Sequence, residues 1–91
     1  MEGRNLIAVI GDESTVTGCL LAGVGEKFEH SNETNYLIVT NDTKTQEIEN
    51  TFRSFTRNPV IAVVMITKDV AQRIQMLIDN YEGVEPVVTV L

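Results

Sequence analysis

The sequence predicts an α/β domain built on a parallel β-sheet, because four short apolar runs alternate with three helical patterns. The runs, all rich in Val and Ile, are Leu6–Ile10, Tyr36–Thr40, Val60–Thr67 and Pro86–Leu91. None shows the apolar–polar alternation of a half-exposed strand, so we expect both faces of each strand to be covered. With 91 residues, 43% of them hydrophobic, we expect one small domain spanning residues 1–91.

The first apolar run ends abruptly at Gly11-Asp12-Glu13, and a helical pattern follows at once. Asp12 or Ser14 can cap the free amides at the start of this helix. The face turned to the sheet is predicted to carry Val16, Cys19, Leu20 and Gly23. Gly18 and Gly23 each cost the helix about 1 kcal/mol relative to Ala. We expect them to allow close approach to the sheet, the alternative being contact with a partner's backbone.

The other two helices are located by their start and stop signals. The second begins with Thr43–Gln46, which has the spacing of a capping box, and stops before Asn58-Pro59. The third begins after Thr67, a possible N-cap, and ends at Gly83. The predicted buried stripes comprise Ile48, Phe52 and Phe55 in the second helix and Val70, Ile74, Leu77, Ile78 and Tyr81 in the third.

Right-handed crossovers in this order of elements favour the strand order 2-1-3-4 of a flavodoxin-like or Rossmann-like sheet. The first helix then lies on one face, and the other two helices lie on the opposite face. Strands three and four are left without a helix on the first helix's side. We expect a partner, or a C-terminal helix that is not in this sequence, to cover that aliphatic face.

Composition restricts the partners. The formal charge of −6 disfavours nucleic acid and anionic membranes, and it favours a protein or a cation. The longest unbroken aliphatic run, Val60–Ile66, is too short to span a bilayer, and no secretion signal opens the chain. Cys19 is the only cysteine, which excludes an internal disulfide and favours a reducing cytosol. We therefore expect a cytoplasmic protein without direct membrane insertion.

The residue pattern argues against catalysis and against a bound cofactor or metal. A dinucleotide site needs glycines between strand and helix, whereas Gly23 and Gly25 follow the helix and the turn itself is acidic. A receiver-like signalling domain would use Asp12 and Glu13 to hold Mg²⁺, but it also needs an aspartate at the end of strand three. His30 has no second His or Cys placed to complete a metal site.

Several segments together carry a resemblance to a known family: Leu6–Glu13, Thr15, Thr17-Gly18, Leu20–Gly25, Asn35–Val39, Glu47–Phe52, Ile61–Ile66, Val70-Ala71 and Arg73-Ile74. In these segments the sequence closely resembles the F subunit of the eukaryotic vacuolar-type proton ATPase. Two departures stand out. The family continues beyond the fourth strand into a charged stretch and a final helix, whereas this sequence ends at Leu91. The acidic stretch usual before strand three reads Arg57-Asn58-Pro59 here.

This resemblance implies a non-catalytic rotor subunit of the central stalk. It would pack against the coiled-coil D subunit and help to couple ATP hydrolysis to proton translocation through the membrane ring. Contacts with the catalytic hexamer of A and B subunits would come mainly from the C-terminal tail. The protein would be peripheral, on the cytosolic face of vacuolar and other endomembranes. The alternative from the residues alone is a receiver-like signalling domain with an acidic Mg²⁺ site.

Three loop segments are the candidates for partner contact, because binding residues concentrate in loops held by a rigid scaffold. The candidate residues are Gly11, Asp12, Glu13 and Ser14 in the first turn, Glu26, Lys27, Phe28, Glu29 and His30 in the loop up to Asn35, and Thr67, Lys68 and Asp69 after the third strand.

Overall fold

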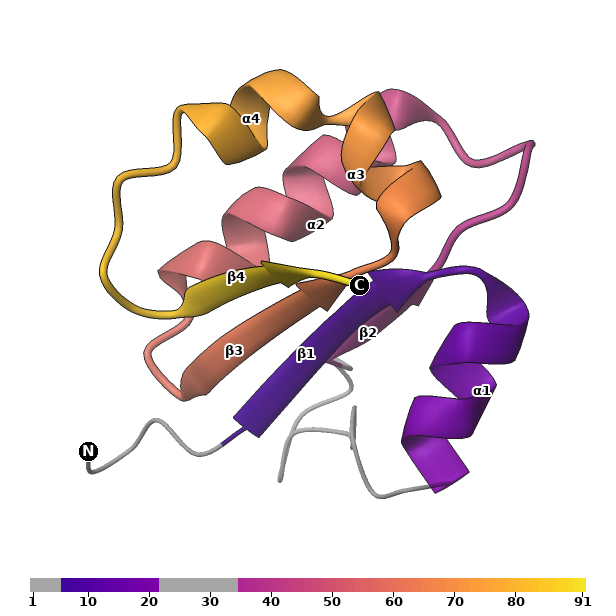
Figure 1. Ribbon diagram of the computed structural model, residues 1–91, viewed down its shortest axis with the longest axis horizontal. Coiled ribbons are helices and arrows are strands. Elements are labelled where there is room, and N and C mark those ends of the chain that lie inside the picture. Colours follow the sequence, from indigo (N-terminus) through magenta and orange to yellow (C-terminus); the bar gives the residue numbers. More distant parts are fainter. Residues whose placement is uncertain (1–5, 22–34) are drawn as a thin grey trace.

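Eight helices and strands make up the computed structural model, which describes residues 6–21 and 35–91 (Figure 1). In chain order they are β1 (Leu6–Gly11), α1 (Glu13–Leu21), β2 (Tyr36–Ile38), α2 (Thr45–Arg57), β3 (Ile61–Ile66), α3 (Lys68–Arg73), α4 (Gln75–Asp79) and β4 (Val87–Val90). All four predicted strands are confirmed, and the second helix ends before Asn58-Pro59 as expected.

The strands form one parallel sheet in the order β2-β1-β3-β4, which confirms the predicted topology. The central pair, β1 and β3, aligns Ala8 with Val64 and Ile10 with Ile66. At the edge, Val64 pairs with Val88 of β4. These residues all belong to or pack against one hydrophobic core.

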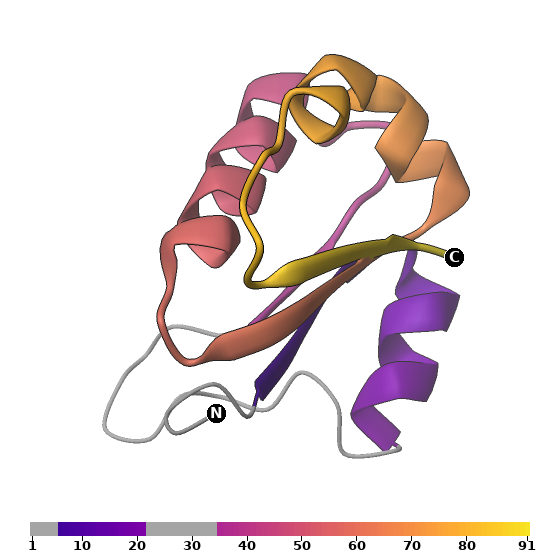
Figure 2. The ribbon, with the colours of Figure 1, turned by 60° about the vertical axis from the view of Figure 1, so that its left-hand side comes forward.

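That core lies between the sheet and a layer formed by α2, α3 and α4 (Figures 1 and 2). The helix α2 contributes Ile48, Phe52 and Phe55, all buried, at the spacing of one helical face. Phe52 meets the ring of Tyr81 edge to face, with the ring centroids 6.1 Å apart. Tyr81 in turn donates a hydrogen bond of 2.6 Å to the carbonyl oxygen of Pro86, which connects this cluster to the start of β4.

The helix α1 lies on the opposite face of the sheet, where it packs against β1 and β2 (Figure 2). Val16 is its one buried residue, and Val9 of β1 is buried as well. Gly18 is exposed, with nothing within 4 Å of the position of an added Cβ. The expectation that Gly18 allows close approach to the sheet is therefore wrong, and Gly23 lies outside the described residues.

The predicted third helix is broken into α3 and α4 at Ile74, whose φ and ψ of −126° and 32° are not helical. The amide of Ile74 donates to Ala71, while its carbonyl accepts from Leu77 and Ile78. No Gly or Pro marks this position, so the break has no local sequence signal. The side chain of Ile74 is buried in the core at this turn. We therefore attribute the change in chain direction to tertiary packing and not to helix propensity.

Two predicted helix caps also differ from the structure. Lys44 occupies the N-cap of α2 without a side-chain cap hydrogen bond, so the capping box is wrong. The hydroxyl of Thr43 instead accepts a hydrogen bond of 2.9 Å from the amide of Thr40 and so closes the preceding turn. Thr67 does occupy the N-cap of α3, but its side chain makes no cap hydrogen bond.

Phe52 provides a direct test of this packing. We expect Phe52→Ala to lower the free energy of unfolding by about 3–5 kcal/mol, because the cavity it leaves lies between α2, Tyr81 and the sheet. Met76 on α4 is 77% exposed and is the matched control, for which Met76→Ala should change stability by less than about 0.5 kcal/mol. Urea denaturation measures both values, and equal losses would contradict the assignment of the core.

Candidate partner-binding site at the carboxyl edge of the sheet

The carboxyl ends of β1, β2 and β3 enclose a shallow pocket of about 180 Å³. It is lined by Asp12, Val39, Thr40, Asn41, Thr67, Asp69, Val70 and Arg73. The parallel strands bring these residues together because their carboxyl ends meet at one edge, the usual ligand-binding edge of such sheets. The chain continues to pair beyond β2, since the amide of Val39 donates to the carbonyl of Gly11 at 2.8 Å.

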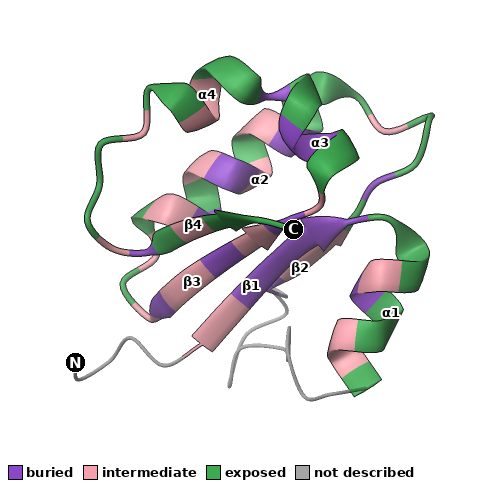
Figure 3. Cartoon of the chain, viewed as in Figure 1, coloured by how far each residue is buried: buried purple, intermediate pink, exposed green. Residues whose placement is uncertain are grey.

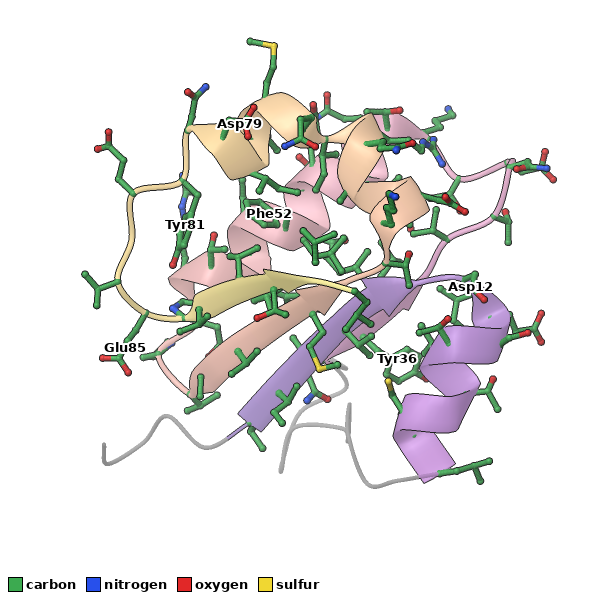
Figure 4. All side chains as sticks on the ribbon, viewed as in Figure 1. Asp12, Tyr36, Phe52, Asp79, Tyr81 and Glu85 are labelled. Atoms are coloured by element: carbon green, nitrogen blue, oxygen red, sulfur yellow. The ribbon has the colours of Figure 1, made fainter. Side chains whose placement is uncertain are left out.

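Asp12 caps α1 at the rim of this pocket (Figure 4). Its carboxylate accepts hydrogen bonds from the hydroxyl of Thr15 at 2.7 Å and from the Thr15 amide at 3.2 Å. These hydrogen bonds, the hydroxyl first, lower the pKa of the exposed Asp12 carboxyl below its ordinary value. Asp12, and not Ser14, is therefore the N-cap, and this structural role occupies the acid that a metal site would need.

Gly11 and Thr67 pack against each other at the base of the pocket. A Cβ added at Gly11 would lie 2.5 Å from the Cγ2 methyl of Thr67 and 3.2 Å from its hydroxyl oxygen. The amide of Thr67 also donates to the carbonyl of Ile10 at 3.0 Å. A side chain at Gly11 would therefore overlap the Thr67 side chain, an overlap that glycine avoids.

Arg73 fixes the loop between β2 and α2. Its guanidinium donates to the carbonyl oxygens of Thr40 and Thr43 and to the hydroxyl of Thr45. The positive charge at the pocket is thus already engaged with the protein's own backbone. Arg73 therefore shapes the wall of the pocket, and it is not presented as a free anion-binding group.

The structure brings two of the three predicted segments together. Asp12, Thr67 and Asp69 line the same pocket, while Gly11 is buried beside it and Lys68 is exposed on α3. Glu13 and Ser14 are exposed in the first turn of α1. The third predicted group, Glu26, Lys27, Phe28, Glu29 and His30, lies outside the described residues.

Sequence reasoning missed the contribution of Val39, Thr40, Asn41, Val70 and Arg73 to this pocket. The first three follow β2 directly, so the rule that parallel strands end at one edge could have included them. Val70 and Arg73 lie three residues apart in α3, next to Asp69, so the helix predicted to begin after Thr67 could have placed both at this edge.

The described part of the chain offers few side chains that could bind a metal ion. Over residues 6–21 and 35–91 there is no group of three His, Cys, Asp or Glu side chains that could hold a metal ion. β3 ends at Ile66 and is followed by Thr67, where a receiver domain would place its aspartate, and Asp69 lies instead in the first turn of α3.

Comparison with known proteins identifies the family. The family model for the ATP synthase (F/14-kDa) subunit matches residues 7–91. The chain belongs to this family.

Two relatives are named as the F subunit of the V-type proton ATPase. The one from Dictyostelium discoideum is 52% identical over 83 residues, which cover 91% of this chain and 68% of the relative. The one from Homo sapiens is 43% identical over 89 residues, which cover 97% of this chain and 74% of the relative. The resemblance seen in the sequence is thereby confirmed.

A solved structure shares the fold. The crystal structure of the V-type ATP synthase F subunit from Archaeoglobus fulgidus superimposes with a TM-score of 0.67 at 22% identity. The match covers 97% of this chain and 98% of the archaeal one. The four-stranded sheet and its helical layer are therefore features of the family fold.

The close contact at Gly11 yields a stability prediction. We expect Gly11→Ala to lower the free energy of unfolding by about 1–3 kcal/mol, because the new methyl overlaps the Thr67 methyl. In the double variant Gly11→Ala/Thr67→Ala the overlapping atoms are gone, and most of the stability should return. Thermal or urea denaturation of the two variants and of Thr67→Ala checks this, and a double variant no better than Gly11→Ala would refute the contact.

The capping of α1 yields a pH prediction. The pKa of Asp12 is lower in the folded chain than in the unfolded chain, so its charge stabilises the fold above the unfolded pKa. That stabilisation is lost as the pH falls through the folded pKa. We therefore expect the stability difference between the natural chain and Asp12→Asn to be constant near neutral pH and to shrink below about pH 4. Urea titrations at several pH values measure the difference, and a pH-independent gap would contradict the capping role.

Proposed function

We propose that this chain is a non-catalytic rotor subunit in the central stalk of a V-type ATPase. Its role is to help couple ATP hydrolysis in the catalytic hexamer to proton translocation through the membrane ring. The observation that carries the proposal is the family match over residues 7–91, together with 52% identity to an F subunit of the V-type proton ATPase. These matches support a role as a subunit of a V-type ATPase. The position in the central stalk and the role in coupling are what we propose.

The geometry of the pocket supports a binding role over a catalytic one. Asp12 caps a helix, Thr67 packs on Gly11, and Arg73 holds a loop. Asp12 and Arg73 are thus engaged in hydrogen bonds that hold the chain's own backbone. What remains for other molecules is the surface that these groups form.

The proposed direct partner is the coiled-coil D subunit of the central stalk, with the carboxyl-edge residues among its contacts. Contacts with the A and B subunits of the hexamer are assigned mainly to the tail that the family carries after β4. The same proposal puts the chain at the cytosolic face of vacuolar and other endomembranes. In keeping with a peripheral protein, none of the described helices is long and apolar enough to cross a bilayer.

Co-expression with the coiled-coil D subunit tests the proposal. We expect a stable equimolar complex that survives gel filtration, because a stalk protein must remain bound while torque is transmitted. The double variant Asp12→Ala/Asp69→Ala alters the candidate pocket and should weaken binding of the D subunit. Glu49→Ala on α2 is the control and should leave binding unchanged. Failure of the unaltered chain to bind the D subunit would overturn the proposal.

A receiver-like role is the competing hypothesis, because Asp12 and Asp69 line one pocket. We expect no Mg²⁺-dependent phosphorylation by acetyl phosphate, since Thr67 stands at the end of β3. Intact-mass spectrometry after incubation checks this. An added phosphoryl group that disappears in Asp69→Asn would support the signalling role and contradict the rotor assignment.

A further inference from the structure

The described residues cover only half of the sheet face that carries α1. The strand register places two rows of side chains across this face, Ile7–Val63–Val87 and Val9–Met65–Thr89. Val64, Ile66 and Val88 point the other way, into the core beneath α2, α3 and α4. Since α1 packs against β1 and β2, the side chains of β3 and β4 on this face have no described helix above them (Figure 2).

The uncovered half is apolar and accessible. Val87 is 52% exposed, Thr89 is exposed, and Met65 and Val63 are only partly buried (Figure 3). Beyond them Leu91 is 50% exposed at the end of the edge strand. The whole segment from Pro86 to Leu91 has no charged side chain, although an exposed edge strand is normally protected by charges.

The dimensions of the open half match one α-helix. Neighbouring strands lie about 4.8 Å apart, so β3 and β4 together offer a strip about 10 Å wide. A helix has a diameter of about 10 Å, and packed helices lie about 8–10 Å apart. One helix alongside α1 would therefore complete the second helical layer that a parallel sheet requires.

Charge indicates what kind of helix fits. The elements next to the open half are α1, which packs on β1 and β2, and the end of the loop leading into β4. They carry Glu13 and Glu85. Among the described residues, every Lys and Arg lies between Lys44 and Arg73, in or next to α2 and α3. A partner helix with Lys or Arg on the flanks of its apolar stripe is complementary to this border.

We propose that the open half of the sheet, formed by Val63, Met65, Val87 and Thr89, docks an amphipathic helix with basic flanks from the coiled-coil component of the stalk. This inference rests on the proposed function and names the surface that carries it. The apolar stripe covers β3 and β4, and the basic flanks face the acids of α1 and of the β4 loop. The carboxyl-edge pocket then contributes at the border of the interface and not at its centre.

Variants on the two faces of the chain test the surface. With the purified D subunit as the probe, we expect Val87→Glu to weaken binding by about tenfold or more, because a charge would be buried without a partner. Met65→Glu should act in the same way. Met76→Glu, on the α4 side of the molecule, is the matched control and should change the affinity by less than about twofold. Raising the salt concentration should weaken binding of the unaltered chain, since opposite charges border the interface.

The outcomes separate the two proposals. If the unaltered chain fails to bind the D subunit, the proposed function itself fails. If it binds, and Val87→Glu, Met65→Glu and Met76→Glu bind equally well, the docking surface is wrong and the function stands. Binding that is independent of salt would overturn the basic flanks alone.

Photo-crosslinking covers the case in which a glutamate variant does not fold. A benzophenone is attached at Val87→Cys in a Cys19→Ser background, with Met76→Cys as the control site. We expect the Val87 probe to crosslink to the D subunit and the Met76 probe not to do so. A crosslink from Val87 to a second copy of this chain, or to its own residues only, would overturn the proposal.

Discussion

A parallel sheet must be covered on both faces, and this constraint determines most of what the molecule presents to its surroundings. The strand order β2-β1-β3-β4 puts α2, α3 and α4 on one face and α1 on the other. The first face closes over a core that includes Ile48, Phe52 and Ile74. On the second face, within residues 6–21 and 35–91, α1 covers only β1 and β2. The apolar half over β3 and β4 is the surface that we propose for a partner.

At the carboxyl edge of the sheet, two charged side chains are engaged in hydrogen bonds within the chain itself. Asp12 holds the first turn of α1 through Thr15, and Arg73 holds the loop after β2. Gly11 and Thr67 bring β1 and the start of α3 into contact. In other α/β proteins this edge often binds nucleotides. Here its side chains hydrogen-bond to and pack against each other.

Most of the fold follows from the sequence, because its signals are local. Apolar runs locate the strands, Asn58-Pro59 ends α2, and Asp12 begins α1. The errors arose where tertiary contacts override local preference. The break at Ile74 lies in an uninterrupted helical pattern, and Thr43 closes a turn in place of capping a helix. Gly18 faces open space although its spacing suggested contact with the sheet. Of the eight residues that line the pocket, Asp12, Thr67 and Asp69 were predicted from strand ends, and Val39, Thr40 and Asn41 follow the same rule.

The most direct test of the central claim is methyl NMR of the methionines, of which the chain has three. Met65 lies on the half-covered face, whereas Met76 is exposed on α4. With a soluble paramagnetic agent in the buffer, binding of the D subunit should protect the Met65 methyl group from line broadening and leave Met76 as broad as before. Protection of Met76 with no change at Met65 would show that the partner binds the other face, and it would contradict the account.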